Sequence, residues 1–321
     1  MRVLFVSGGK FGDASFLIKN QAESLTKKGI EVDFFIIGGK GILGYLKSIP
    51  KLRKKVNKVK YDIVHAHYSF SAFAASLAGQ FPLVVSLMGS DVYMSTFWRW
   101  FVRIFCYLRW NATIVKTKQM KELLKISKVF VIPNGVNIKR YSFIEKTVAR
   151  EKIKYFSEKK LVIFIADPSR PEKNFTLAKQ AVDALNSPEI VLLTVYNVSN
   201  ELIPYYLNAA DVLLLTSKWE GSVNVIKEAM ACNCPIVATD VGDIKLVVGQ
   251  TEGCYVTSFN PIDIAEKLKL AIEFNRRTNG RDRIISLGLD SETIANKIID
   301  IYKKVINKNA KKKLNSNASS H

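Results

Sequence analysis

The sequence is poor in cysteine, and its cysteines fit no structural framework. The four cysteines, Cys106, Cys232, Cys234 and Cys254, stand at no spacing typical of a disulfide scaffold or a zinc site. We therefore expect reduced thiols and a cytoplasmic protein. The chain also lacks the P-loop motif G-x-x-x-x-G-K-[ST] and any Asp-x-Asp pair. Its N-terminus, MRVLFVSGG, has too short an apolar run for a signal peptide and predicts a first strand.

Long apolar runs are also scarce. One uncharged run, residues 68–90, has the length of a membrane span. The sequence GQFP at residues 79–82 interrupts it, because glycine and proline break regular structure. The run therefore predicts a small-residue helix (SAFAASLAG) followed by a buried strand (LVVSL).

Acidic residues are few in the first half of the chain. Residues 1–150 hold 25 Lys+Arg against 8 Asp+Glu, a net charge of +17, whereas the remainder holds 23 against 20, a net charge of +3. This asymmetry predicts that the first half faces an anionic partner or a negatively charged membrane surface. A lysine-rich coding bias is the alternative, although such a bias should add basic residues to both halves of the chain alike.

Short β-branched runs alternate with helical patterns along most of the chain. Such alternation, with nearly continuous apolar strands, predicts parallel sheets covered on both faces, in an α/β fold. The pattern pauses after VIPNGVNIKRYSF and restarts at LVIFIA. We therefore predict two doubly wound domains, residues 1–150 and 151–321, facing each other across a cleft suited to a small molecule. A final helix and basic polar tail, residues 290–321, is expected to pack back on the first domain. The predicted strands are RVLFVS, EVDFFII, YDIVHAH, PLVVSL, ATIVK, KVFVI, LVIFIA, IVLLTV, DVLLLT, PIVATD and GCYVTS.

The stretch WEGSVNVIKEAMACNCPIVATDVGD, residues 219–243, places two carboxylates around the start of a helix. Glu220 precedes the predicted helix, Ser222 is its predicted N-cap, and Glu228 lies inside it. A helix N-terminus attracts anions, and carboxylates accept hydrogen bonds from vicinal hydroxyls. This arrangement suits a nucleotide sugar. An ordinary amphipathic helix with one exposed Glu is the alternative.

Two further loops follow predicted strands. Arg170 and Lys173, in DPSRPEKNF, form a cationic pair suited to a leaving diphosphate, with ordinary surface charge as the alternative. Gly8 and Gly9, in SGGKFG at residues 7–12, permit close approach of a ligand to the backbone. The spacing G-G-x-x-G differs from the dinucleotide fingerprint G-x-G-x-x-G, which disfavours NAD binding.

Taken in order, these motifs resemble glycosyltransferase family 4, the retaining enzymes with the GT-B fold of two Rossmann-like domains. Residues 220–228 are similar to the E-x7-E motif of that family, and RPEK at 170–173 to its R-x-x-K phosphate pair. PNGVN at 133–137 and NAADVLLLTS at 208–217 match the segments between its domains and before its E-x7-E loop. The SGG loop and GSD at 89–91 match its N-terminal domain.

The resemblance implies a role for each matched residue. Catalysis would rest on Glu220, Arg170 and Lys173. The donor would be bound by Gly8, Gly9, Gly221, Ser222, Val223, Asn224 and Glu228, with Glu228 on the ribose hydroxyls. Contacts to the acceptor or sugar would come from His67, Met88, Asp91 and Asn134. No cofactor and no metal are expected, because the chain has no Asp-x-Asp pair for metal-bridged binding of a diphosphate and the two cations should bind it instead.

The sequence departs from the family in three places. Val223 stands where a Pro or Phe is common, which is a mild departure. Met88 stands where the family often has an active-site His, and His67 is a partial substitute or an ordinary packed histidine. The stretch from TVYNVSN to ELIPYY is short, which suggests that a strand–helix portion around the nucleotide base is trimmed.

We therefore expect a retaining hexosyltransferase that uses a nucleoside diphosphate sugar and a glycan or lipid-linked acceptor in cell-surface polysaccharide synthesis. The alternatives are a GT-B nucleotide-sugar epimerase and a basic nucleic-acid-binding protein. No recognisable nucleic-acid module is present, so no nucleic-acid partner is expected.

Two basic segments are candidates for contact with an anionic membrane, at the inner face of the plasma membrane. Residues 95–110 mix three arginines with several aromatic residues, and residues 47–60 form a basic face. Packing of residues 95–110 on the sheet, and simple solvation of residues 47–60, are the alternatives.

Overall fold

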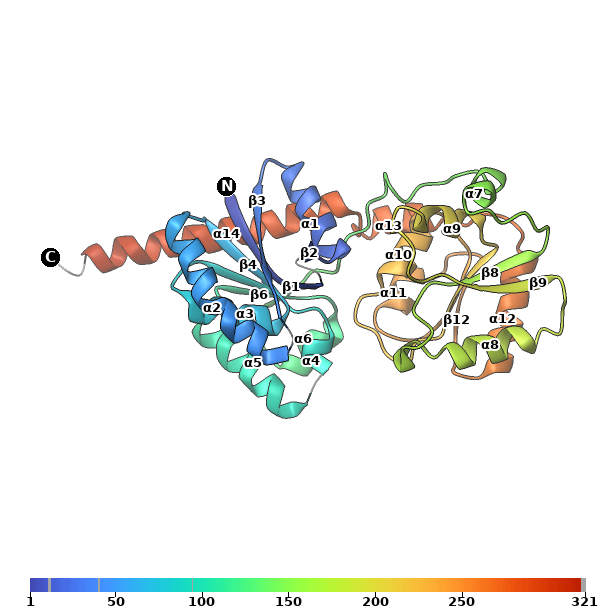
Figure 1. Cartoon of the computed structure of the whole chain (residues 1–321), viewed down its shortest axis with the longest axis horizontal. Helices are drawn as coiled ribbons and strands as arrows, with labels where there is room; N and C mark the ends of the chain where they lie inside the picture. The colour runs from blue at the N-terminus through green and yellow to red at the C-terminus, as the bar shows by residue number, and fades with distance from the viewer. Residues whose placement is uncertain (11–12, 40, 94, 319–321) are drawn as a thin grey trace. The chain divides into compact units, whose positions relative to one another are not determined.

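The chain forms two compact α/β units. The structure, a computed structural model, describes residues 1–10, 13–39, 41–93 and 95–318. The first unit consists of Met1–Asn134 with Ser291–His321, and the second of Gly135–Asp290. Each unit contains one mainly parallel sheet with helices on both faces (Figure 1). The predicted fold class of two parallel-sheet α/β domains is confirmed.

The first unit is built on a sheet in the order β2-β1-β4-β5-β6-β7, in which β3 also pairs with β1. The β1–β2 pair is antiparallel and the other pairs are parallel. Its strands are β1 (Arg2–Lys10), β2 (Asp13–Ala14), β3 (Glu31–Ile37), β4 (Ile63–His67), β5 (Leu83–Ser86), β6 (Ala112–Val115) and β7 (Val129–Val131). Its helices are α1 (Phe16–Thr26), α2 (Gly41–Lys58), α3 (Ser69–Ala78), α4 (Ser90–Tyr93), α5 (Thr96–Leu108), α6 (Lys118–Leu124) and α14 (Ser291–Ala318).

Alternation along β1 explains why residues 3–6 of this strand are all apolar. Leu4 and Val6 pack in the cluster that includes residues of α2, α3, α5 and α6. Val3 and Phe5 point the other way and pack with residues of α1 and α14. Both faces of the strand are therefore covered, as in parallel sheets generally.

The final helix, α14, belongs to the first unit. Ile294, Ile298 and Tyr302 are buried against its sheet. The Tyr302 hydroxyl is hydrogen-bonded to Nδ1 of His65 (2.6 Å), and Nε2 of His65 is hydrogen-bonded to Oγ of Ser86 (2.9 Å). The helix continues to Ala318, further along the basic segment than the sequence pattern indicates.

The uncharged run at residues 68–90 forms α3 and then β5, as predicted. Within the described ranges, no helix combines the length and the apolar character that crossing a membrane requires.

The second unit is built on a parallel sheet in the order β12-β11-β10-β8-β9. One face is covered by α9, α10, α11 and α13, and the other by α8 and α12. Its strands are β8 (Lys160–Phe164), β9 (Ile190–Thr194), β10 (Val212–Leu215), β11 (Ile236–Thr239) and β12 (Cys254–Thr257). Its helices are α7 (Lys146–Lys152), the 3-10 turn η1 (Pro171–Lys173), α8 (Phe175–Asp183), α9 (Ile203–Ala209), α10 (Asn224–Ala231), α11 (Ile244–Val248), α12 (Pro261–Glu273) and α13 (Gly280–Ser286).

The division between the units lies after Asn134, earlier in the chain than the boundary after residue 150 that the sequence pattern indicates. Hydrogen bonds from backbone N–H groups tie the segment that follows to the second unit. The Val136 N–H donates to the carbonyl oxygen of Leu289 (2.9 Å), and the Ile144 N–H donates to Oδ1 of Asn208 (3.0 Å). These hydrogen bonds attach the residues after Asn134 to the second unit. Hydrophobic periodicity gives no sign of them, so the sequence pattern places the boundary too late.

Tyr302→Phe tests the attachment of α14. The substitution leaves Nδ1 of the buried His65 without its partner, so we expect a loss of about 1–3 kcal/mol in the free energy of unfolding. Urea denaturation of the full chain measures this loss. Tyr155→Phe is the matched control, since the buried Tyr155 hydroxyl has no hydrogen-bond partner among the described residues. Equal stability of the two variants contradicts the proposed anchor.

Candidate functional site

The predicted catalytic residues meet at the carboxyl ends of β8 and β10. These strands are parallel neighbours, so the loops that follow them lie side by side. The loop after β8 carries Lys173, and the loop after β10 carries Glu220. The two side chains form an ion pair, and each is 17% exposed. The topology thus joins two residues that are far apart in the sequence.

Hydroxyl groups and backbone atoms fix these two loops to each other. Ser217 donates a hydrogen bond to Oε1 of Glu220 (2.8 Å). Thr216 donates to the carbonyl oxygen of Lys173 (3.1 Å), and the Lys218 N–H donates to the carbonyl oxygen of Glu172 (2.8 Å). Thr216 and Ser217 end the NAADVLLLTS segment that resembles the family, but the motif assigns no role to either side chain.

Arg170 lies at the surface of the same site. It directly precedes η1, and its Nε donates to Oε1 of Glu172 (2.7 Å). Its side chain is 55% exposed, so this pair adds little to stability. Backbone hydrogen bonding, together with Arg170, lowers the pKa of the Glu172 carboxyl. Arg170 and Lys173 therefore form a cationic edge whose charges are paired with carboxylates.

The start of α10 differs from the prediction. Ser222 is not the N-cap: Val223 holds that position and makes no side-chain capping bond. Instead, the Asp243 carboxylate accepts from the Ser222 hydroxyl (2.7 Å) and from the Val223 N–H (3.1 Å). The Asp243 carboxylate, in the loop between β11 and α11, therefore holds the turn between β10 and α10. The Val223 N–H is already used in this contact.

Asp243 also neutralises a buried lysine. Lys227 is 1% exposed, and its Nζ lies 3.4 Å from Oδ2 of Asp243 and donates to the Ser222 hydroxyl. Burial lowers the pKa of Lys227, whereas Asp243 opposes that shift. Gly242, at a φ of +61°, lets this turn approach: a Cβ there would lie 2.2 Å from the carbonyl oxygen of Gly221. Lys227 and the Gly242–Asp243 pair are residues that the sequence analysis missed.

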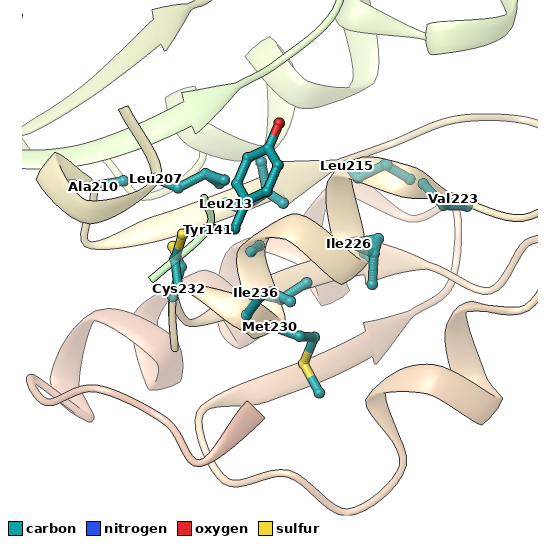
Figure 2. Packing of buried hydrophobic residues seen from close by; sticks show 14 of the residues in the cluster. Tyr141, Leu207, Ala210, Leu213, Leu215, Val223, Ile226, Met230, Cys232 and Ile236 are labelled. Atoms are coloured by element: carbon teal, nitrogen blue, oxygen red, sulfur yellow. The ribbon is translucent and has the colours of Figure 1, made fainter. Parts of the chain in front are cut away.

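Glu228 lies one turn into α10, close to Tyr141. Burial raises the pKa of Glu228 to about 7. A hydrogen bond from the Tyr141 hydroxyl and the charges of Arg140 and Lys227 act in the opposite direction and lower the pKa of Glu228. Figure 2 shows Tyr141 among the buried side chains of this unit, with its hydroxyl oxygen directed away from the apolar residues labelled around it.

The glycine motif of the first unit has a structural role in the sheet of that unit. Residues 7–12 are expected to form a loop, but β1 continues through Gly8 and Gly9, and Gly9 pairs with Ala14 of the antiparallel strand β2. A Cβ on Gly9 would lie 2.1 Å from the carbonyl oxygen of Asp13, so only glycine fits this close approach. The rest of the predicted motif includes residues 11–12, which lie outside the described residues.

The predicted acceptor contacts of the first unit are mostly buried. His67, at the end of β4, is 1% exposed, and neither of its ring nitrogens has a hydrogen-bond partner among the described residues. Burial, with the nearby charge of Lys116, lowers the pKa of His67 to about 3, so the ring is neutral. Met88 is partly buried, and Asn134 is 7% exposed at the end of the unit's first segment.

Asp91 has a structural role within the first unit. It is fully buried, and its carboxylate accepts from the backbone N–H groups of Ser69 (3.1 Å), Met88 (3.0 Å) and Gly89 (2.9 Å). Burial raises its pKa to about 6. Asp91 therefore ties the loop after β5 to the start of α3.

The arginines of α5 bind the protein rather than facing outward as a group. Arg103 donates to the carbonyl oxygen of Leu124 (2.7 Å) at the end of α6. Arg109, the residue after the helix, donates to the carbonyl oxygen of Ser76 (2.5 Å) near the end of α3. These arginine side chains hydrogen-bond carbonyl groups at or near the C-termini of helices, which explains much of the basic character of residues 95–110.

Two family descriptions match the chain over consecutive ranges. Residues 15–140 match "Glycosyltransferase Family 4", and residues 136–273 match "Glycosyl transferases group 1". The chain belongs to this family of glycosyltransferases. The resemblance inferred from the E-x7-E and R-x-x-K motifs is thus confirmed, as is transferase activity at the level of the family.

Curated relatives of this chain are also named as glycosyltransferases. An Escherichia coli UDP-Gal:alpha-D-GlcNAc-diphosphoundecaprenol alpha-1,3-galactosyltransferase is 27% identical, over 80% of this chain and 79% of the relative. An uncharacterised glycosyltransferase of Methanocaldococcus jannaschii is also 27% identical, over 70% of each chain.

Solved structures identify the fold of the glycosyltransferase as GT-B. Sucrose-phosphate synthase from Thermosynechococcus elongatus is similar with a TM-score of 0.80 at 16% identity, covering 95% of this chain and 99% of that one. HepE from Anabaena, in complex with UDP, is similar with a TM-score of 0.75 at 17% identity, covering 95% and 100%.

A cavity lies beside the site in this glycosyltransferase. It has a volume of about 400 Å³ and lies at the ends of β8 and β9. The short stretch after β9, in which the sequence suggests a trimmed portion, forms part of its wall. Lining residues include Ile165, Asp167, Val195, Tyr196, Asn197 and Asn200.

Asp243→Asn tests the support beneath α10. The substitution leaves the buried Lys227 ammonium without a carboxylate, so we expect a loss of about 3–5 kcal/mol in the free energy of unfolding. The double variant Asp243→Asn/Lys227→Met removes both charges and should recover most of that loss. Urea denaturation compares the two, and equal instability of single and double variants contradicts the charge pairing.

Proposed function

We propose that this protein transfers a hexosyl group from a nucleoside diphosphate sugar to a hydroxyl of a glycan or lipid-linked acceptor, with retention of anomeric configuration, in cell-surface polysaccharide synthesis. The observation that carries the proposal is the ion pair of Lys173 with Glu220 at the carboxyl ends of β8 and β10, with Arg170, paired with Glu172, in the same loop as Lys173. The name of the Escherichia coli relative, which gives a UDP-sugar donor and a diphosphoundecaprenol-linked acceptor, supports the substrate classes.

The second unit offers a group for each part of such a donor. Glu228 accepts hydrogen bonds from the ribose hydroxyls, and the 400 Å³ cavity beside β9 receives the base. Arg170 and Lys173 bind the diphosphate, and Glu220 contacts the sugar. In binding, the diphosphate competes with Glu172 and Glu220 for the two cations, which limits the attraction of unrelated anions.

The chemistry needs charge stabilisation more than a nucleophile. The bond from the anomeric carbon to the diphosphate breaks while the acceptor oxygen forms its bond on the same face, and the acceptor proton passes to a phosphate oxygen. The transition state resembles an oxocarbenium ion, with negative charge growing on the diphosphate. Preorganised cations stabilise that charge, so we propose that the reaction is independent of metal ions.

Arg170→Ala and Lys173→Ala test this assignment. Each substitution should lower kcat by about 10²–10³-fold, because it removes one donor to the developing charge. Transfer of radiolabelled sugar measures the rate, with excess chelator present in a parallel arm that should leave the wild-type rate unchanged. Lys179→Ala, an exposed lysine on α8, is the matched control. Full turnover by the Arg170→Ala/Lys173→Ala double variant would falsify the assignment.

We propose that contact with an anionic membrane is made through α2. Its N-terminal turns expose Ile42, Leu43 and Leu46, which are 58%, 67% and 50% exposed. Exposed lysines follow along the same helix, at Lys47, Lys51, Lys54 and Lys58. Apolar side chains at the interface and lysines on lipid phosphates suit a peripheral helix. Such contact would bring a lipid-linked acceptor to the first unit.

Sedimentation with vesicles of anionic phospholipid tests this contact. The wild-type protein should sediment at low salt and be released at high salt, because exposed charges are screened. The triple variant Lys51→Ala/Lys54→Ala/Lys58→Ala should lose most of its binding. The control carries Lys159→Ala/Lys179→Ala/Lys245→Ala, three exposed lysines of the second unit, and should bind like the wild type. Equal binding by both triple variants rules out α2 as the contact.

A further inference from the structure

Exposed apolar side chains gather at the N-terminal ends of two helices of the first unit. Ile42, Leu43 and Leu46 lie in the first two turns of α2. Phe97 and Trp100 lie in the first two turns of α5, where they are 69% and 53% exposed. Because α2 follows β3, and α5 follows β5 after the short α4, both ends lie at the carboxyl edge of the parallel sheet. This is the edge at which ligands of such sheets bind.

A ladder of aromatic rings joins the two groups across α3. The ring centroid of Tyr45, in α2, lies 5.3 Å from that of Phe70, in α3, which lies 4.5 Å from that of Trp98, in α5. The ring centroid of Phe101 lies 6.2 Å from that of Trp98 and 5.0 Å from that of Phe97. The exposed side chains therefore rest on a packed aromatic support, and the ends of α2, α3 and α5 form one surface.

Tyr68 reaches the same ladder from a strained backbone. It stands between β4 and α3 with φ of +80° and ψ of +146°, which residues other than glycine rarely adopt. The Tyr68 N–H donates to the carbonyl oxygen of Ser86 (2.9 Å), and the next N–H, of Ser69, donates to the Asp91 carboxylate (3.1 Å). Held in this way, Tyr68 places its ring centroid 5.7 Å from that of Phe70. Strain that the surrounding structure maintains is typical of ligand sites.

The charge of these helices favours an anionic amphiphile. Residues 41–58, 69–78 and 96–108 contain no Asp or Glu, and exposed lysines follow the apolar turns of α2. An exposed apolar surface with basic residues beside it suits a hydrocarbon chain that carries an anionic headgroup. A sugar alone suits it less well, because a site for a polar ligand needs polar groups that fix its orientation, and the exposed side chains of this surface are apolar.

We propose that the apolar ends of α2 and α5, with the aromatic ladder between them, bind the hydrocarbon chain of a lipid-linked acceptor that has an anionic headgroup. The inference rests on the proposed function, because it selects the lipid-linked acceptor from the two acceptor classes given there. Tyr68 is a positioning residue of this surface. The chain lies along the carboxyl edge of the sheet, so the sugar of the acceptor is held at that edge.

Binding of farnesyl diphosphate to the full chain tests the surface. Calorimetry measures it below the critical micelle concentration, in a background that carries Arg170→Ala/Lys173→Ala so that the headgroup does not bind at the proposed donor site. Phe97→Ala/Trp100→Ala should weaken binding about tenfold or more, because burial of apolar area supplies most of the affinity. Inorganic diphosphate, the headgroup alone, should bind the background far more weakly than farnesyl diphosphate does.

The matched control lies at the other end of the same helix. Tyr107 and Leu108 are 64% and 74% exposed, beyond the aromatic ladder. Tyr107→Ala/Leu108→Ala therefore removes as much exposed apolar surface from α5, and it should bind farnesyl diphosphate as the background does.

Tyr68→Gly separates binding from stability. Glycine adopts a positive φ without strain, so this variant should keep its Tm while it binds farnesyl diphosphate several-fold more weakly. Unchanged binding by Tyr68→Gly contradicts the role of Tyr68, whatever the Tm.

Two results overturn the inference. One is equal binding of farnesyl diphosphate by the Phe97→Ala/Trp100→Ala variant and its control. The other is a loss of vesicle binding or of self-association in Phe97→Ala/Trp100→Ala while farnesyl diphosphate binding persists, which assigns the surface to the bilayer or to a second copy of the chain. Both leave the proposed function intact, because the transfer assay with the Arg170 and Lys173 variants tests that function separately.

Discussion

The ion pair between Lys173 and Glu220 depends on one constraint, the parallel pairing of β8 with β10. Parallel neighbours bring their carboxyl ends to the same edge, so the loops that leave them must share space. Thr216 then joins those loops through a hydrogen bond to the carbonyl oxygen of Lys173, and Ser217 holds the Glu220 carboxylate within its own loop. Any shift in the sheet register would separate the acid from the cation, and the chemistry of the site would be lost with the geometry.

The sequence predicts the strands well because both faces of each sheet are covered. EVDFFII forms β3 over the same residues, Glu31–Ile37, and every other predicted strand is present. The prediction of β1 was too short, because its last residues depend on pairing with β2. That pairing needs Gly9, where the two backbones approach too closely for a side chain. Periodicity detects burial, but it does not detect a turn held by backbone contacts.

The partners of charged residues could not be predicted in the same way. The pattern of Arg103 and its neighbours resembles a surface for lipid phosphates, yet Arg103 binds the carbonyl oxygen of Leu124. Ser222 stands at the usual place for an N-cap, yet Asp243 accepts its hydrogen bond. In both cases the partner comes from another element, so its identity depends on tertiary packing. The spacing of the motifs identifies the acids and cations of the site. The residues that bind and surround them are seen only in the structure.

One buried ion pair explains how α10 keeps its orientation. Lys227 is buried beside Asp243, which also accepts from the Ser222 hydroxyl just before the helix. Successive residues on a helix point about 100° apart, so Glu228 on the same turn faces a different direction from Lys227. Rotation of the helix would break the ion pair and leave a buried cation without its carboxylate, which is costly in a protein interior. The charges buried beneath the site therefore fix the helix on which its second carboxylate is carried.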